Sequence, residues 1–114
     1  MKIPIVVEDS SIPKLLSVFI SIGAITLWPF IIVRNKLNPS LLRHESIHIR
    51  QQQELLIVGF YLMYVYYWLK GLWIWRGDSQ IAYYTIPFEQ EAYDNEHDED
   101  YLKHRKKFAW WKYR

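Results

Sequence analysis

Residues 38–48 read Asn-Pro-Ser-Leu-Leu-Arg-His-Glu-Ser-Ile-His, and this stretch predicts a helix with two histidines on one face. Asn38 is a residue type that caps helix N-termini, and Pro39 suits the first helical position, where the missing N–H costs no hydrogen bond. His44 and His48 are four residues apart, so their imidazoles lie one turn apart on the same side of the helix. Both rings can therefore reach one zinc ion, with nitrogen to metal distances of about 2.0 to 2.1 Å.

Residues 44–48 also form an HExxH motif, in which Glu45 follows the first histidine. Glu45 projects from the edge of the metal-binding face, where it can hold and deprotonate a water molecule on the ion. The face continues to Gln51 and Leu55 at spacings of three and four, and it becomes apolar. The three successive glutamines at 51–53 are typical of a solvated face, although one of the first two could hydrogen-bond to a ligand histidine.

A catalytic zinc site normally has three protein ligands and leaves a fourth position to water, so a third ligand is needed. The chain contains no cysteine, which leaves a carboxylate or one of the remaining histidines, His97 and His104. Both lie in residues 94–107, where acidic side chains precede basic ones. That order predicts an exposed helix supported by i,i+4 ion pairs, with both histidines at the surface.

The carboxylate candidates lie in residues 85–95, which read Thr-Ile-Pro-Phe-Glu-Gln-Glu-Ala-Tyr-Asp-Asn. Thr85 is a candidate N-cap and Pro87 falls in the first turn, so the stretch has the start signature of a second helix. Glu89 and Glu91 then lie in the first or second turn. Either side chain could complete the metal site.

These residues together resemble the gluzincin group of zinc metallopeptidases, which includes thermolysin and the CAAX prenyl proteases. In that group a glutamate on a second helix follows the HExxH motif after a few dozen residues. In several branches the second motif reads Glu-x-x-Ala-Asp or Glu-x-x-Ala-Asn, and residues 89–93, Glu-Gln-Glu-Ala-Tyr, match it except at the last position. The resemblance implies that His44, His48 and Glu89 bind zinc and that Glu45 is the general base.

Tyr93 is the departure from that pattern, because the family tends to have there a short polar residue that accepts a hydrogen bond from a ligand histidine. A ligating imidazole usually donates its other N–H to such an acceptor, which fixes its tautomer. Asp94 and Asn95 are candidates for this role. Asn95 lies four residues after Glu91, so a register with Glu91 as the ligand stays open beside the Glu89 register, which we prefer.

Length and composition limit the classes of protein that this chain can represent. Its 114 residues predict a single domain, residues 1–114, with one modest core. The absence of cysteine excludes disulfides and thiolate metal sites, and it fits a reducing compartment. A net charge of +2, without a basic stripe outside the extreme C-terminus, argues against a nucleic-acid partner.

Two apolar stretches stand out, and the first, Leu15–Val33, runs for nineteen residues without a charge. By length alone it could be a transmembrane helix. Its β-branched residues and the Trp28-Pro29 pair instead favour a short helix after Pro13, followed by a strand, a turn and a strand. Such a strand would border the active site and hold a substrate backbone by strand addition. Glu8 and Asp9 argue against a cleavable signal peptide, so we expect a cytoplasmic or membrane-associated protein.

The second apolar stretch, Leu55–Trp75, follows the HExxH helix directly. Gly59 is expected to bend or end that helix, and Lys70-Gly71 is expected to end the helix after it. Aromatic residues recur here too densely for one face, which predicts burial on several sides or a place at a membrane interface. Residues 108–114 mix aromatic and basic side chains, a composition that suits either a strap over the core or a membrane-surface anchor.

These observations predict a small α+β domain of zincin-like architecture, in which a short β-hairpin packs on the HExxH helix and two or three further helices close the site. The predicted function is hydrolysis of peptide bonds in a peptide or protein substrate, with Zn²⁺ as the cofactor. Glu45 would take the proton of the attacking water and pass it to the leaving amine. Two alternatives stay open: a small membrane-associated protein without enzymatic activity, and a metal-stabilised binding module.

Overall fold

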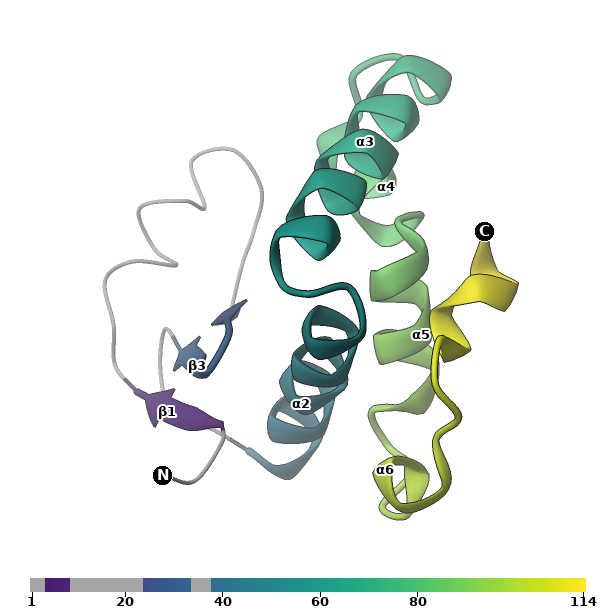
Figure 1. Ribbon diagram of the computed structural model, residues 1–114. Coiled ribbons are helices and arrows are strands. Elements are labelled where there is room, and N and C mark those ends of the chain that lie inside the picture. The colour runs from purple at the N-terminus through teal and green to yellow at the C-terminus, as the bar shows by residue number, and fades with distance from the viewer. Residues whose placement is uncertain (1–3, 9–23, 34–37) are drawn as a thin grey trace.

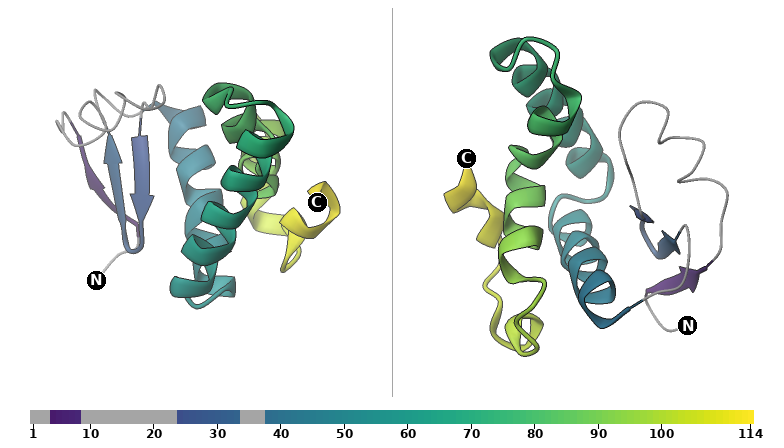
Figure 2. Two further views of the ribbon diagram at one scale, coloured as in Figure 1. Left: turned by 90° about the horizontal axis from the view of Figure 1, so that it is seen from above. Right: turned by 180° about the vertical axis from the view of Figure 1, so that it is seen from behind.

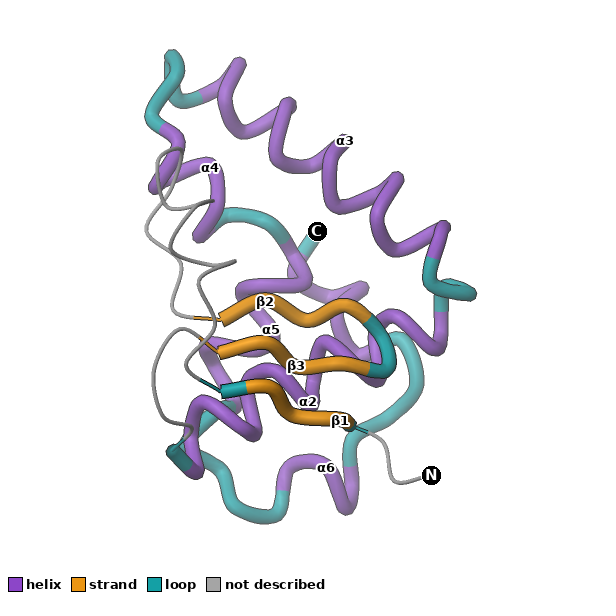
Figure 3. Tube along the Cα trace, turned by 90° about the vertical axis from the view of Figure 1, so that its left-hand side faces the viewer, coloured by secondary structure: helices purple, strands orange, loops and turns teal. Residues whose placement is uncertain are grey.

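The computed structural model describes residues 4–8, 24–33 and 38–114. Three short strands, β1 (Ile5–Val7), β2 (Ala24–Leu27) and β3 (Phe30–Val33), form one sheet in the order β1-β3-β2. The central strand β3 pairs antiparallel with β2 and parallel with β1 (Figure 3). The sheet lies along one side of helix α2 (Pro39–Glu54), and the other helices lie on its opposite side or beyond its C-terminal end (Figures 1 and 2).

Strands β2 and β3 form the predicted hairpin, with a cis Trp28-Pro29 peptide bond in its two-residue turn. Ile31 and Val33 of β3 are buried against Ile49 of α2, and these contacts hold the sheet on the helix. A single helix running through Val33, which the transmembrane alternative requires, is therefore wrong. The predicted helix after Pro13 lies outside the described residues, and the pairing of β1 with the hairpin was not predicted.

Helix α2 begins where its sequence predicts. The side-chain oxygen Oδ1 of Asn38 accepts a hydrogen bond from the backbone N–H of Leu41 at 2.8 Å, and Pro39 is the first helical residue. The face of α2 that turns inward carries the residues of the HExxH motif. Gln51 and Gln52 are also fully buried, and only the third glutamine of the run is exposed, so the predicted solvated face is wrong for two of the three.

The break between α2 and the next helix, α3 (Val58–Ile74), comes earlier than predicted. The chain turns through Leu56 and Ile57, whose φ angles of 58° and 67° are left-handed. Gly59 already lies in the first turn of α3, so the prediction that it ends the HExxH helix is wrong. The resulting bend of 113° carries Phe60 into the core, where it contacts Phe88.

Helix α3 continues through Lys70-Gly71, so the prediction that this pair ends it is wrong. Gly71 instead lies where α3 packs closely on its neighbour. The helix contacts α4 (Ser79–Tyr84), where a Cβ at position 71 would lie 2.9 Å from the Cα of Ala82. In the described part of the chain, no helix alone is both long and apolar enough to cross a membrane. Helices α2 and α3 meet the length and hydropathy criteria only when they are taken as one span across the 113° bend between them.

Helix α5 (Pro87–Asn95) packs on α2 from the side opposite the sheet. Its N-cap is Ile86 and not Thr85, because Thr85 ends α4 and donates its hydroxyl to the carbonyl of Ala82 at 3.0 Å. The helix nevertheless brings Glu89 into its first turn, as predicted. Phe88, beside it, joins the buried core described above.

The C-terminal segment contains two short helices, α6 (Tyr101–His104) and the 3₁₀ helix η1 (Ala109–Tyr113). The continuous exposed helix predicted for residues 94–107 is wrong, because Arg105 turns inward to a buried carboxylate pair instead of facing solvent. Trp110 is buried against Phe88, so this end of the chain is a strap packed over the core. The α+β class is confirmed, with more helices than expected.

Replacing Gly71 with alanine should destabilise the protein although alanine favours helices. The added Cβ would meet the Ala82 backbone at 2.9 Å and its Cβ at 3.0 Å, so α3 and α4 must separate. We expect a loss of about 1 to 3 kcal/mol in the free energy of unfolding, measured by urea denaturation. Gly59→Ala in the same helix is the control, because its Cβ would meet only Leu55 Cβ at 3.6 Å and should be neutral or stabilising. Equal effects of the two changes would contradict this packing account.

Candidate metal centre

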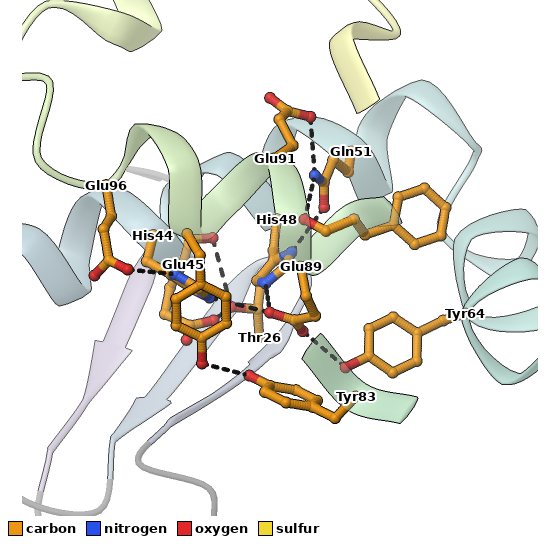
Figure 4. A network of polar contacts seen from close by, with 12 residues as sticks. Thr26, His44, Glu45, His48, Gln51, Tyr64, Tyr83, Glu89, Glu91 and Glu96 are labelled. Atoms are coloured by element: carbon orange, nitrogen blue, oxygen red, sulfur yellow. Dashed lines mark hydrogen bonds and ion pairs between the residues drawn. The ribbon is translucent and has the colours of Figure 1, made fainter. Parts of the chain in front are cut away.

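The structure brings together the three residues that the sequence proposed as metal ligands. Glu89 Oε1 lies 3.1 Å from Nε2 of His44 and 3.0 Å from Nε2 of His48. All three side chains are buried, and the three facing atoms lie within 4.8 Å of one another. The histidines come from α2 and the glutamate from α5, so the site spans the contact between the two helices (Figure 4).

Gln51 determines the tautomer of His48. Its Oε1 lies 2.7 Å from His48 Nδ1, while its Nε2 donates to the Phe88 carbonyl and to Glu91 Oε1, both at 3.0 Å. A carbonyl and a carboxylate can only accept hydrogen bonds, so the amide nitrogen must face them and the amide oxygen must face the histidine. Nδ1 of His48 therefore carries a proton, so that whenever the ring is neutral its lone pair lies on Nε2, the nitrogen that faces Glu89.

Glu96 lies on the outer side of His44, with its Oε1 3.6 Å from His44 Nδ1, a distance that suits an ion pair but is too long for a hydrogen bond. Arg43 donates a hydrogen bond to the backbone carbonyl of Glu96 and holds that residue near the site. Tyr93, the departure from the gluzincin pattern, accepts no hydrogen bond from His44 but packs its ring against that imidazole, with centroids 4.4 Å apart. Neither of the predicted partners takes this place: Asp94 is exposed, and the Asn95 amide donates to the Glu91 carbonyl.

The two oxygens of Glu89 have different surroundings. Oε1 faces both imidazoles, whereas Oε2 accepts a hydrogen bond of 2.7 Å from the hydroxyl of Tyr64 on α3. Burial alone would raise the pKa of Glu89, but the charge on His48 and the hydrogen bonds from both histidines lower it far below its usual range. Burial alone would lower the pKa of His48, yet Glu89 raises it to about 9. Without a cation, protonation of His48 therefore relieves the repulsion between its lone pair and the carboxylate.

Glu45 is buried beside this group but is not part of it. Its Oε2 accepts a hydrogen bond from the hydroxyl of Thr26 on β2. The carbonyl of Thr26 in turn accepts hydrogen bonds from the Gln52 amide at 2.8 Å and from the Tyr61 hydroxyl at 3.0 Å. The Gln52 amide oxygen also accepts from the N–H of Trp28 at 2.7 Å. Strand β2 is thus tied to both long helices next to Glu45.

Glu91 points away from the histidines and belongs to a second ion-pair network, which Gln51 connects to His48. Arg105 donates to its carboxylate at 2.6 and 3.1 Å, and Tyr101 donates at 2.7 Å. The same guanidinium makes two bonds, of 2.9 and 3.0 Å, to Glu54 at the end of α2. Burial alone would raise the pKa of Glu91, but these hydrogen bonds and the one from Gln51 lower it. The structure therefore places Glu89, and not Glu91, beside the histidines.

Several residues of the site were missed by sequence reasoning. Glu96 could have been found, because it lies seven residues after Glu89 and so returns to the same helical face. Nothing in the sequence around Thr26 or Tyr64 indicates a role in the site, since both side chains reach it only through tertiary contacts. His97 and His104 are exposed, as predicted.

No protein-family model, curated protein or solved structure matches this chain. The resemblance to gluzincins therefore rests on the motif residues alone. Among the described residues, His44, His48 and Glu89 form the group of His, Asp and Glu side chains whose arrangement suits a metal ion.

Replacing Gln51 with methionine should weaken metal binding without removing a ligand. The change preserves most of the side-chain volume but leaves His48 Nδ1 without its acceptor. We expect the zinc dissociation constant to rise by about ten-fold to a hundred-fold, measured by competition with a chromophoric chelator. Gln53→Met, two residues away on the exposed side of α2, is the control and should leave the affinity unchanged. If Gln51→Met also left it unchanged, Gln51 would not orient His48.

Proposed function

We propose that this protein is a zinc-dependent peptidase, with His44, His48 and Glu89 as the metal ligands and Glu45 as the general base. One observation carries the proposal: Nε2 of both imidazoles turns toward a single oxygen of Glu89 at the contact between two helices. Buried histidines need hydrogen-bond partners in any core, but a core role does not require that two of them converge on one carboxylate oxygen. The Gln51 oxygen, 2.7 Å from His48 Nδ1, adds support, because the outer hydrogen bond of a ligand histidine sets its tautomer.

The donor set favours zinc over the other common divalent cations. Two imidazole nitrogens and one carboxylate oxygen form a His₂Glu set, which catalytic zinc sites use and which leaves one position open. Magnesium and calcium prefer sites made of oxygen atoms alone. The second oxygen of Glu89 is held by Tyr64, which leaves Oε1 as its ligand atom.

A bound zinc ion would supply a Lewis acid that polarises a substrate carbonyl and makes water acidic. The side chains around it have separate tasks in hydrolysis. The Thr26 hydroxyl holds one oxygen of Glu45, so the other oxygen is left to accept a proton from the attacking water and return it to the leaving amine. The Tyr83 side chain lies near the site (Figure 4), and its hydroxyl is 3.1 Å from that of Tyr93, whose ring packs on His44. Burial, together with the charge of Glu89, raises the pKa of Tyr83, so it stays protonated and can donate to a developing oxyanion.

Strand β2 is where the proposal places an extended substrate. It is a terminal strand of the sheet, and Thr26 connects it directly to Glu45. Gln52 already occupies backbone groups of Thr26 and Trp28, so this part of the edge is closed to an added strand. A peptide would therefore pair near Ala24, at the other end of β2.

Zinc content and peptide hydrolysis in matched variants test this function. We expect about one zinc ion per chain in the wild type, loss of zinc in Glu89→Gln, and retention in Glu91→Gln, the same change two residues further along α5. Glu45→Gln should keep the metal and lose about a hundred-fold or more in hydrolysis of a peptide library.

The outcomes separate the two halves of the proposal. A wild-type protein that takes up no zinc under non-chelating conditions would overturn the metal site. Stoichiometric zinc without hydrolysis of any peptide would keep the metal site but overturn the peptidase, leaving a metal-stabilised binding module.

A further inference from the structure

The outward side of α3 exposes a continuous row of large apolar side chains. Val58, Leu62, Val65, Leu69 and Trp73 follow at spacings of four, three, four and four, which keeps them on one face of the helix. Their exposed fractions lie between 52% and 87%. We call this row the α3 outer face. Figure 3 shows α3 running along one margin of the molecule, with its N-terminal end near the β2–β3 hairpin.

The opposite side of α3 already has its partners. Phe60, Tyr64, Tyr67 and Trp68 pack on the buried core around Phe88. The helix is therefore apolar around its whole circumference although the described residues cover only one side of it, a composition that water-exposed helices do not have. Soluble monomers rarely expose so large a contiguous apolar surface, which indicates a binding partner for the outer face.

The charges around this face indicate the chemistry of the partner. Residues 55–77 contain no Asp or Glu, and their two basic residues, Lys70 and Arg76, are both exposed near the C-terminal end of α3. Trp73 and Trp75 are exposed beside them. Apolar side chains along one helix face, with tryptophans and cations gathered at one end, match the acyl and headgroup zones of an anionic bilayer.

We propose that the α3 outer face binds the surface of an anionic phospholipid bilayer. The helix has 17 residues and is therefore about 25 Å long, shorter than the roughly 30 Å of the hydrocarbon core, so it lies in the interface and does not span it. A second copy of the chain is a less suitable partner for the α3 outer face. Lys70 and Arg76 of one copy would find no acidic residue in residues 55–77 of the other copy. This proposal is independent of the peptidase activity.

Co-sedimentation of the full chain with phospholipid vesicles tests the proposal. The protein should bind vesicles that contain phosphatidylglycerol and bind more weakly to phosphatidylcholine alone. Leu62→Ser combined with Trp73→Ser should reduce binding about ten-fold or more, since Leu62 would enter the acyl region and Trp73 its boundary with the headgroups. Trp111→Ser, at a half-exposed tryptophan outside α3, is the control and should bind as the wild type does.

Further measurements separate the partner classes. Lys70→Gln combined with Arg76→Gln should remove the preference for phosphatidylglycerol and keep residual binding to both vesicles. All variants should keep the wild-type circular dichroism spectrum and zinc content. A loss of vesicle binding is therefore distinguishable from a failure of the proposed metal site. The proposal is overturned if the wild type binds no vesicles, or if it forms a dimer in solution that Leu62→Ser with Trp73→Ser dissociates.

Discussion

The interaction on which the structure depends is the approach of one carboxylate oxygen of Glu89 to the Nε2 atoms of His44 and His48. A buried carboxylate is costly unless an opposite charge or hydrogen-bond donors compensate it. Here two imidazoles face it; Gln51 holds the outer nitrogen of His48, and Glu96 lies 3.6 Å from the outer nitrogen of His44. The contact between α2 and α5 is thus organised around a point that suits a cation, and without one a proton on His48 compensates the charge of Glu89.

A second buried ion-pair network supports the first from the side of the C-terminus. Arg105 bridges Glu91 of α5 and Glu54 of α2, so it joins the same two helices that carry the histidines and Glu89. Glu91 also accepts a hydrogen bond from Gln51, which links this network to His48. The strap that follows Arg105 packs over the core. Charges that would destabilise an apolar interior are therefore paired and hydrogen-bonded, as buried ions must be.

What the sequence predicts well is local, and what it misses depends on distant contacts. Asn38 and the HExxH spacing specify α2 through capping and periodicity, so the helix and its histidine face were predicted. Whether Gln51 is buried depends on Phe88 and Glu91, far along the chain, and it was therefore misjudged as solvated. Gly71 was misread as a stop, because its close approach to another helix leaves no mark in the neighbouring sequence. The sequence offers Glu89 and Glu91 as candidates for a third ligand and favours Glu89, and the tertiary structure places Glu89 beside the histidines and Glu91 beside Arg105.

The most direct test of the metal site is anomalous diffraction at the zinc absorption edge from crystals of the wild-type protein grown with zinc. The account predicts a single strong peak with zinc to ligand distances of about 2.0 to 2.2 Å to Nε2 of His44, Nε2 of His48 and one oxygen of Glu89. A peak bound by Glu91 or Glu54, or no peak between α2 and α5, would contradict it.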